Sequence, residues 1–179
     1  MKEKTISVCG CTPSSSTTTE NSNRTIIVHF FELDMSRSGV SSCNTCMSVE
    51  DQVLQMVADL RPVLEKVNTV VQVKKTIVQS LNQAEELQFK ASPSIRIDGL
   101  EVLPTQGDIF GLGERFWEWE GSLYNAPPTA LIVDTILRAY ANSEQTQNTT
   151  PFIYQTPEPL REYFTDSFEK NINDNCECS

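Results

Sequence analysis

The chain has 179 residues, 39% of them hydrophobic, and a formal net charge of -10 at neutral pH. This length suits one domain of ordinary size with tails, and the negative charge argues against nucleic acid or anionic lipid as a partner. No apolar run approaches the roughly 20 residues of a membrane span, and the N-terminus lacks the apolar region of a secretory signal. We therefore expect a cytoplasmic protein without a membrane partner. In such a reducing compartment the six cysteines indicate reactive or metal-binding thiols.

The first 33 residues divide into a tail and a strand. Residues 1–23 are polar and of low complexity, so we expect an N-terminal tail, which carries Cys9 and Cys11. Residues 24–33 form a β-branched and aromatic run that predicts a buried central strand. This strand contains His29, the only histidine. We interpret it as a packed, hydrogen-bonded sheet residue rather than a general base or metal ligand.

A Cys-x-x-Cys unit, Cys43 and Cys46, lies between this strand and a long amphipathic helical pattern. Two thiols at this spacing can close a small disulfide, and a helix N-terminus favours the thiolate. The strand before, the helix after and a second strand beyond indicate a thioredoxin-like redox motif, with inert or zinc-holding cysteines as the alternative. We expect Cys43 to be the more exposed and more acidic thiol, because the turn covers the second cysteine.

Apolar residues recur at helical spacing from Val49 to Val67, which predicts a helix with one buried face. Pro62 is expected to kink this helix or to split it near Leu60. The sequence leaves two possible starts for this helix. The helix can begin at the cysteines, or only after the capping box that starts at Ser48.

The middle of the chain predicts a sheet with covering helices. Residues 70–78 read as a strand joined to the first by a right-handed parallel crossover, and residues 81–89 as a short helix. Residues 91–102 predict a proline-led strand, an Asp-Gly turn and a returning strand. Residues 116–121 alternate like a strand with both tryptophans on one face, where plain packing is preferred over a substrate platform. Pro127–Pro128 opens a helix whose apolar face should cover the sheet.

The C-terminal part, residues 142–179, is expected to form a polar linker, a short docked helix over 158–168 and a tail with Cys176 and Cys178. Roughly ten residues separate this helix from Cys176, and an extended linker of that length could reach the central cysteine pair. The predicted domain itself covers residues 24–141.

Several stretches resemble one family when taken together. They are Cys43–Cys46, Leu60–Pro62, Ser92–Gly99 (Ser-Pro-Ser-Ile-Arg-Ile-Asp-Gly), Trp117–Gly121 (Trp-Glu-Trp-Glu-Gly) and Ala126–Ala139. The chain resembles a prokaryotic thioredoxin-like family catalogued only as a domain of unknown function. The resemblance implies an α/β fold with a central mixed sheet flanked by helices. It also implies an attacking Cys43, a resolving Cys46 and a cis Pro93, with the backbone of Ser92 pairing with an extended substrate segment.

The chain departs from this pattern in two places. Members of the family often carry a further cysteine just before the tryptophan strand, where this chain has Glu114-Arg115-Phe116. The loop before Cys43 is also longer than in thioredoxin, and no tryptophan precedes the cysteine pair. A dedicated activity therefore fits better than a general thioredoxin activity.

Two functions of different classes follow. The first is a thiol-disulfide oxidoreductase that needs no cofactor, in which Cys43 attacks a disulfide of a protein or small-molecule thiol. Such an enzyme could be dedicated to the handling of metals or metalloids. The second is a binding or delivery protein for a soft metal or metalloid such as arsenic, mercury or zinc. Its ligands would be Cys9, Cys11, Cys176 and Cys178, with or without the central pair. In a third hypothesis the chain is a scaffold whose tail cysteines have no function.

Overall fold

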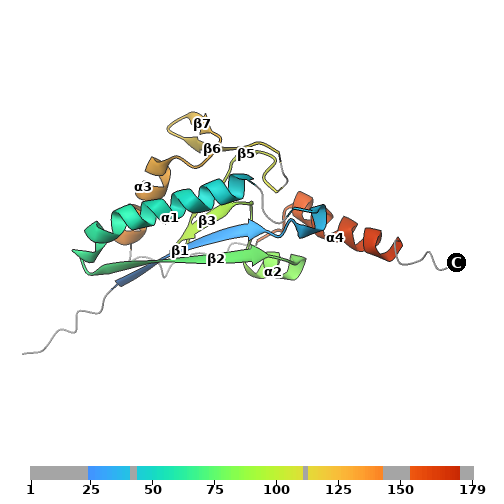
Figure 1. Ribbon diagram of the computed structural model, residues 1–179, viewed down its shortest axis with the longest axis horizontal. Helices are drawn as coiled ribbons and strands as arrows, with labels where there is room; N and C mark the ends of the chain where they lie inside the picture. Colours follow the sequence, from blue (N-terminus) through green and yellow to red (C-terminus); the bar gives the residue numbers. More distant parts are fainter. Residues whose placement is uncertain (1–23, 41–43, 111–112, 143–153, 174–179) are drawn as a thin grey trace, which may run out of the picture.

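The computed structural model describes residues 24–40, 44–110, 113–142 and 154–173 (Figure 1). Its elements, in chain order, are β1 (Arg24–Leu33), the 3-10 helix η1 (Ser36–Ser38), α1 (Asn44–Glu65), β2 (Thr69–Val78), α2 (Leu81–Glu86), β3 (Ser94–Ile97), β4 (Leu100–Val102), β5 (Gln106–Gly107), β6 (Arg115–Trp119), β7 (Ser122–Tyr124), α3 (Thr129–Ala141) and α4 (Glu158–Asn173). The first strand has the predicted bounds. Within these ranges every helix is too short or too polar to cross a membrane.

The strands form a four-stranded mixed sheet in the order β2-β1-β3-β4 and a three-stranded sheet in the order β5-β6-β7. β1 pairs with β2 in parallel along its whole length, as predicted from the helical connection between them. β3 runs antiparallel to β1 and returns into β4 through Asp98 and Gly99. Both turn residues have positive φ angles, 46° and 90°, a conformation that suits the Asp-Gly pair. The predicted mixed sheet with surrounding helices is therefore confirmed.

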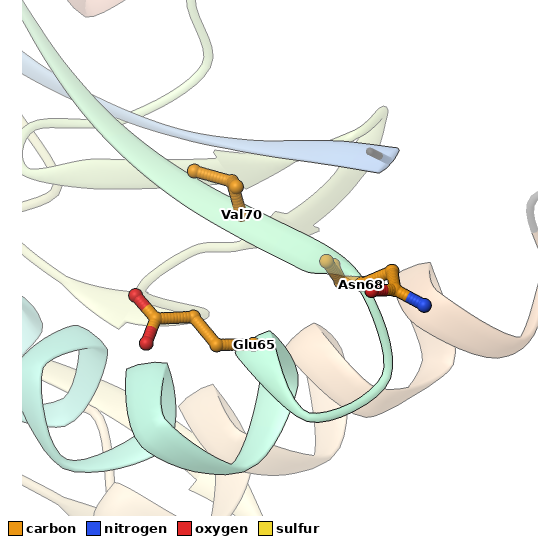
Figure 2. A pocket seen from close by; sticks show the side chains of 4 residues that line it. Glu65, Asn68 and Val70 are labelled. Carbon is orange, nitrogen blue, oxygen red and sulfur yellow. The ribbon is translucent and has the colours of Figure 1, made fainter. Parts of the chain in front are cut away.

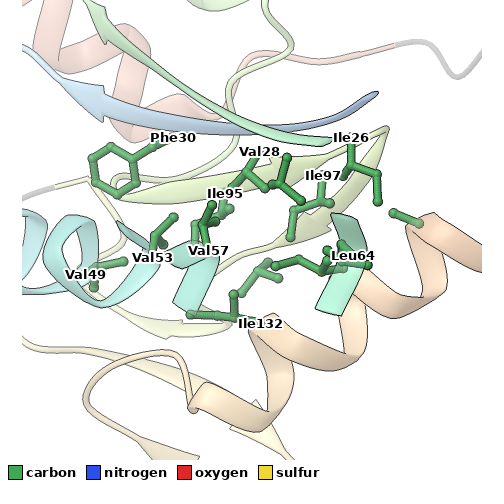
Figure 3. Packing of buried hydrophobic residues seen from close by; sticks show 14 of the residues in the cluster. Ile26, Val28, Phe30, Val49, Val53, Val57, Leu64, Ile95, Ile97 and Ile132 are labelled. Atoms are coloured by element: carbon green, nitrogen blue, oxygen red, sulfur yellow. The ribbon is translucent and has the colours of Figure 1, made fainter. Parts of the chain in front are cut away.

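One face of the larger sheet is covered by α1 and α3, and Figure 3 shows their apolar side chains meeting it. The buried residues are Val49, Val53, Val57 and Leu64 of α1, Ile26, Val28 and Phe30 of β1, Ile95 and Ile97 of β3, and Ile132 and Ile136 of α3. The three valines of α1 are spaced four residues apart, so they form one stripe on the helix. This is the buried face that the sequence pattern predicts.

A second apolar cluster lies on the opposite face, at the C-terminal end of β1. It contains Phe31, Leu33, Met35, Val78, Ala84, Phe89, Phe110, Leu160 and Phe164. Successive strand residues point to opposite faces, so β1 serves both clusters. The predicted docking of the C-terminal helix is confirmed, because Leu160 and Phe164 of α4 belong to this cluster.

Helix α1 is continuous through Pro62, so of the two predicted effects the split near Leu60 is wrong, and the kink stays a prediction. Proline removes one hydrogen bond, the one to the carbonyl four residues earlier, here Ala58. Both residues are exposed, so water can pair with that carbonyl. The helix also begins at Asn44, which excludes a start after Ser48.

Helix α4 is longer than predicted and ends at Asn173 rather than at residue 168. Figure 1 shows it running outward from the body of the molecule. Only residues 174 and 175 then separate the helix from Cys176. A helical residue advances the chain by about 1.5 Å, against roughly 3.3 Å for an extended one. The reach of this tail toward the central cysteine pair is therefore shorter than the sequence suggests.

Candidate functional site around Cys46 and Ser92

Cys46 lies in the first turn of α1 and is 1% exposed. Its Sγ atom lies 3.9 Å from Oγ of Ser92, a residue 46 positions further along the chain. The start of α1 and the turn before β3, both singled out by the sequence, thus meet in space. The predicted burial of the second cysteine is confirmed. Cys43 lies outside the described residues, so its greater exposure remains a prediction.

The Ser92–Pro93 peptide bond is cis, as predicted. The three polar groups of Ser92 are all bonded within the chain. Its N–H donates to the Ile109 carbonyl at 2.8 Å, its Oγ accepts from the Leu33 N–H at 2.9 Å, and its carbonyl accepts from the Arg115 guanidinium. The predicted pairing of the Ser92 backbone with an extended substrate segment stays a prediction. In this structure the N–H is bonded to Ile109, whereas the carbonyl, which accepts from Arg115, has a second lone pair.

Arg115 is a buried arginine that sequence reasoning did not assign to the site. It is the first residue of β6, is 2% exposed, and donates to the carbonyls of Ser92 and Gly113. The only signal for it in the sequence was its place within Glu114-Arg115-Phe116, the segment just before the tryptophan strand. Ser92 thus contacts Arg115 through its carbonyl and Cys46 through its hydroxyl, so the buried cation and the buried thiol are joined by one residue.

A cluster of three charged residues connects the sheet to α1. Glu32 is 3% exposed, and its carboxylate lies 3.1 Å from Nζ of Lys75, which also contacts Glu50 at 2.5 Å. Burial alone would lower the pKa of Lys75, but the hydrogen bonds and charges of Glu50 and Glu32 outweigh it and raise that pKa above its ordinary value. Glu50 follows Cys46 by one helical turn, on the same side of α1. Two carboxylates and one ammonium leave negative charge there, which disfavours a thiolate on Cys46.

His29 lies on the opposite face of the sheet from α1. Its Nε2 is 2.7 Å from Oγ1 of Thr76, and its ring stacks on Phe31 with centroids 4.0 Å apart. Burial and the nearby charges of Arg96 and Lys74 lower its pKa below the ordinary 6.5. These contacts agree with the interpretation of His29 as a packed, hydrogen-bonded sheet residue.

Helix α4 supports the loop that leads to Cys43. The hydroxyl of Tyr163 donates to the Asp34 carbonyl at 2.6 Å. Met35, the next residue, packs in the second apolar cluster with Leu160 and Phe164 of α4. The sequence predicted that this helix docks, but not that it docks on the loop preceding the cysteines.

A separate cavity of about 290 Å³ lies at the other end of α1 and is shown in Figure 2. It is lined by Glu65, Asn68, Thr69 and Val70. Along the helix it is roughly 30 Å from Cys46, at about 1.5 Å per residue. It does not belong to the site at Cys46.

No group of three potential metal ligands occurs among the residues that the structure describes. The four tail cysteines, Cys9, Cys11, Cys176 and Cys178, all lie outside those residues. Their proposed use as ligands for a soft metal therefore remains a prediction.

Residues 27–136 match the model of a family described as a domain of unknown function (DUF2703), which is more than half of the chain. The chain belongs to this family. The DUF2703 region runs from β1 into α3, so it includes Cys46, Ser92, Arg115 and the charged cluster. Helix α4 lies beyond it. No curated protein and no solved structure matches the chain.

Proposed function

We propose that this DUF2703 protein is a thiol-disulfide oxidoreductase with a thioredoxin-like fold, in which Cys43 attacks and Cys46 resolves. The observation that carries the proposal is the 3.9 Å approach of the Cys46 sulfur to the Ser92 hydroxyl. It joins a Cys-x-x-Cys helix start to the turn at Pro93, which is the pairing such an enzyme needs. The strand order β2-β1-β3-β4, with a helical crossover between the parallel pair, supports the fold.

The reaction transfers two electrons between the protein and a substrate disulfide. The Cys43 thiolate attacks one substrate sulfur, the substrate S–S bond breaks, and the first thiolate leaves. Cys46 then loses its proton, attacks the Cys43 sulfur, and releases the second substrate thiolate as the protein disulfide closes. Cys43 has already given its proton to solvent and Cys46 gives up the second, and the two released thiolates take up two protons, so the reaction balances. No cofactor takes part.

The charges around the pair suit these two roles. A helix N-terminus favours the thiolate form of a cysteine placed there, and we assign the attacking role to Cys43 on this ground. Glu50 of the cluster with Glu32 and Lys75 lies one helical turn from Cys46, and negative charge near a buried thiol favours the thiol form that a resolving cysteine starts from. We therefore expect the two cysteines to differ in acidity, as an attacking and a resolving thiol should.

The test is redox titration of the full-length protein followed by peptide mapping. We expect a reversible two-electron couple whose disulfide joins Cys43 to Cys46. Cys46→Ser should accumulate a mixed disulfide on Cys43, whereas Cys43→Ser should not form one at Cys46. Limited iodoacetamide labelling near neutral pH should modify Cys43 first. Faster labelling of Cys46, or a mapped disulfide that omits the pair, would contradict the assignment.

A further inference from the structure

We infer that the Ser92 hydroxyl is a catalytic hydrogen-bond donor, which stabilises the Cys46 thiolate while this cysteine resolves the mixed disulfide. The inference rests on the proposed function and adds a residue to its second step. Its basis is the hydrogen-bond contact of 3.9 Å between the Cys46 sulfur and Oγ of Ser92. Both residues are buried, so water has little access to either atom.

The direction of this hydrogen bond follows from the partners of the hydroxyl. A serine hydroxyl has one hydrogen and two lone pairs. Oγ of Ser92 accepts from the Leu33 N–H at 2.9 Å, which uses a lone pair and leaves the hydrogen for another partner. A neutral thiol can either donate or accept, but a thiolate carries no hydrogen and can only accept. Once Cys46 ionises, the hydrogen bond therefore runs from Ser92 to the sulfur.

Burial makes this donor important for the resolving step. An ionised group with little access to water is costly unless it is hydrogen-bonded. Cys46 gives its proton to solvent and attacks the Cys43 sulfur, and the second substrate thiolate leaves as the protein disulfide forms. Ser92 keeps its own proton and supplies only the hydrogen bond. The Leu33 N–H polarises the hydroxyl and makes it a stronger donor, because hydrogen bonds in a chain strengthen one another.

The charged groups of the surrounding elements also act on the buried thiol. Glu50 on α1 and Glu32 on β1 disfavour its thiolate, whereas Lys75 on β2 partly cancels them. Arg115 on β6 is bonded to the Ser92 carbonyl rather than to the hydroxyl. Removing the hydroxyl leaves all four charged groups in the protein, so its effect can be measured apart from theirs.

The first test measures the ionisation of Cys46 without any disulfide chemistry. In the full-length chain the other cysteines are replaced by serine, and the ultraviolet absorbance of the thiolate is followed as the pH rises. Ser92→Ala should move the midpoint to higher pH, because the thiolate loses its donor. Ser92→Thr keeps a hydroxyl and should bring the midpoint back toward that of the unmodified site. Ser94→Ala, at a second buried serine, is the matched control and should leave the midpoint unchanged.

The second test measures the resolving step itself. Dithionitrobenzoate is an aromatic disulfide that releases one coloured thiolate when Cys43 attacks and a second when Cys46 resolves. The full-length chain is used with the four tail cysteines replaced by serine. Ser92→Ala should slow the second release roughly tenfold at neutral pH, the low end of what losing a hydrogen bond to a charged group costs. The first release should change less.

An unchanged midpoint, or an unchanged second release, in Ser92→Ala would overturn this inference and leave the oxidoreductase intact. Absence of the second release in the unmodified site would instead overturn the proposed function, and the role of Ser92 with it. If Ser92→Ala does not fold, the Leu33 amide decides the question, because its N–H donates to the same oxygen. Its NMR signal should move with the ionisation of Cys46, and by more than that of Asp34, whose N–H donates to Val78. Equal movement of the two signals would refute the donor role.

Discussion

Replacing Lys75 by methionine removes the cation that contacts the buried Glu32 carboxylate. Taking one partner from a fully buried ion pair costs roughly 3–5 kcal/mol of stability. Lys75 is 36% exposed, whereas Glu32 is only 3% exposed. Water therefore already screens part of the attraction, and we expect Lys75→Met to lower the free energy of unfolding by about 2 kcal/mol. Glu32→Gln leaves Lys75 its contact with Glu50 and should cost about 1 kcal/mol.

The double variant Lys75→Met/Glu32→Gln gives the sharper test, because it removes the buried charge together with its partner. It should be less destabilised than Lys75→Met alone, which requires a coupling energy of more than about 1 kcal/mol, and we expect about 2 kcal/mol. The assay is urea unfolding at pH 8 under reducing conditions, with the slope against urea compared between variants. Lys74→Met, on the exposed neighbouring residue, is the control and should stay within about 0.5 kcal/mol of wild type. If Glu32→Gln adds to the cost of Lys75→Met rather than relieving it, the charged cluster does not stabilise the fold as described.

Three further predictions concern pH, the C-terminal helix and the tails. The pKa of His29 lies below its ordinary 6.5, so the unfolded state binds more protons and stability falls as the pH drops through 6.5; His29→Gln should flatten the decrease in urea midpoint between pH 7.5 and 5.5, and an unchanged slope would refute it. Tyr163→Phe removes the hydrogen bond to Asp34, which should cost about 1 kcal/mol and speed hydrogen exchange in η1, whereas unaltered exchange there would show that α4 does not hold this loop. Since two thiolates can share one soft ion, Cys176→Ser/Cys178→Ser should weaken arsenite binding in a titration of the full-length chain, and equal affinity would exclude the C-terminal pair as ligands.

Local patterns predicted most of the secondary structure. The apolar run of β1, the Asp-Gly turn between β3 and β4, and the stripe of α1 each depend on neighbours within a few residues, so the sequence alone reports them. The predictions that were wrong concern the split of α1 near Leu60 and the end of α4. Whether a proline ends a helix depends on whether its freed carbonyl is exposed, and that is a property of the packed fold.

The sequence by itself identified the two segments that make the candidate site, the Cys-x-x-Cys helix start and the Ser92–Pro93 turn. Both are recognised from residue types and their spacing, which need no folded structure. Only the tertiary structure decided what surrounds them. Arg115 reaches the Ser92 carbonyl from a different sheet, and Lys75 meets Glu32 through the parallel register of β1 and β2. Periodicity shows which face a residue lies on, but not which distant residue faces it across a strand pair or a turn. Those partners exist only once the chain is folded.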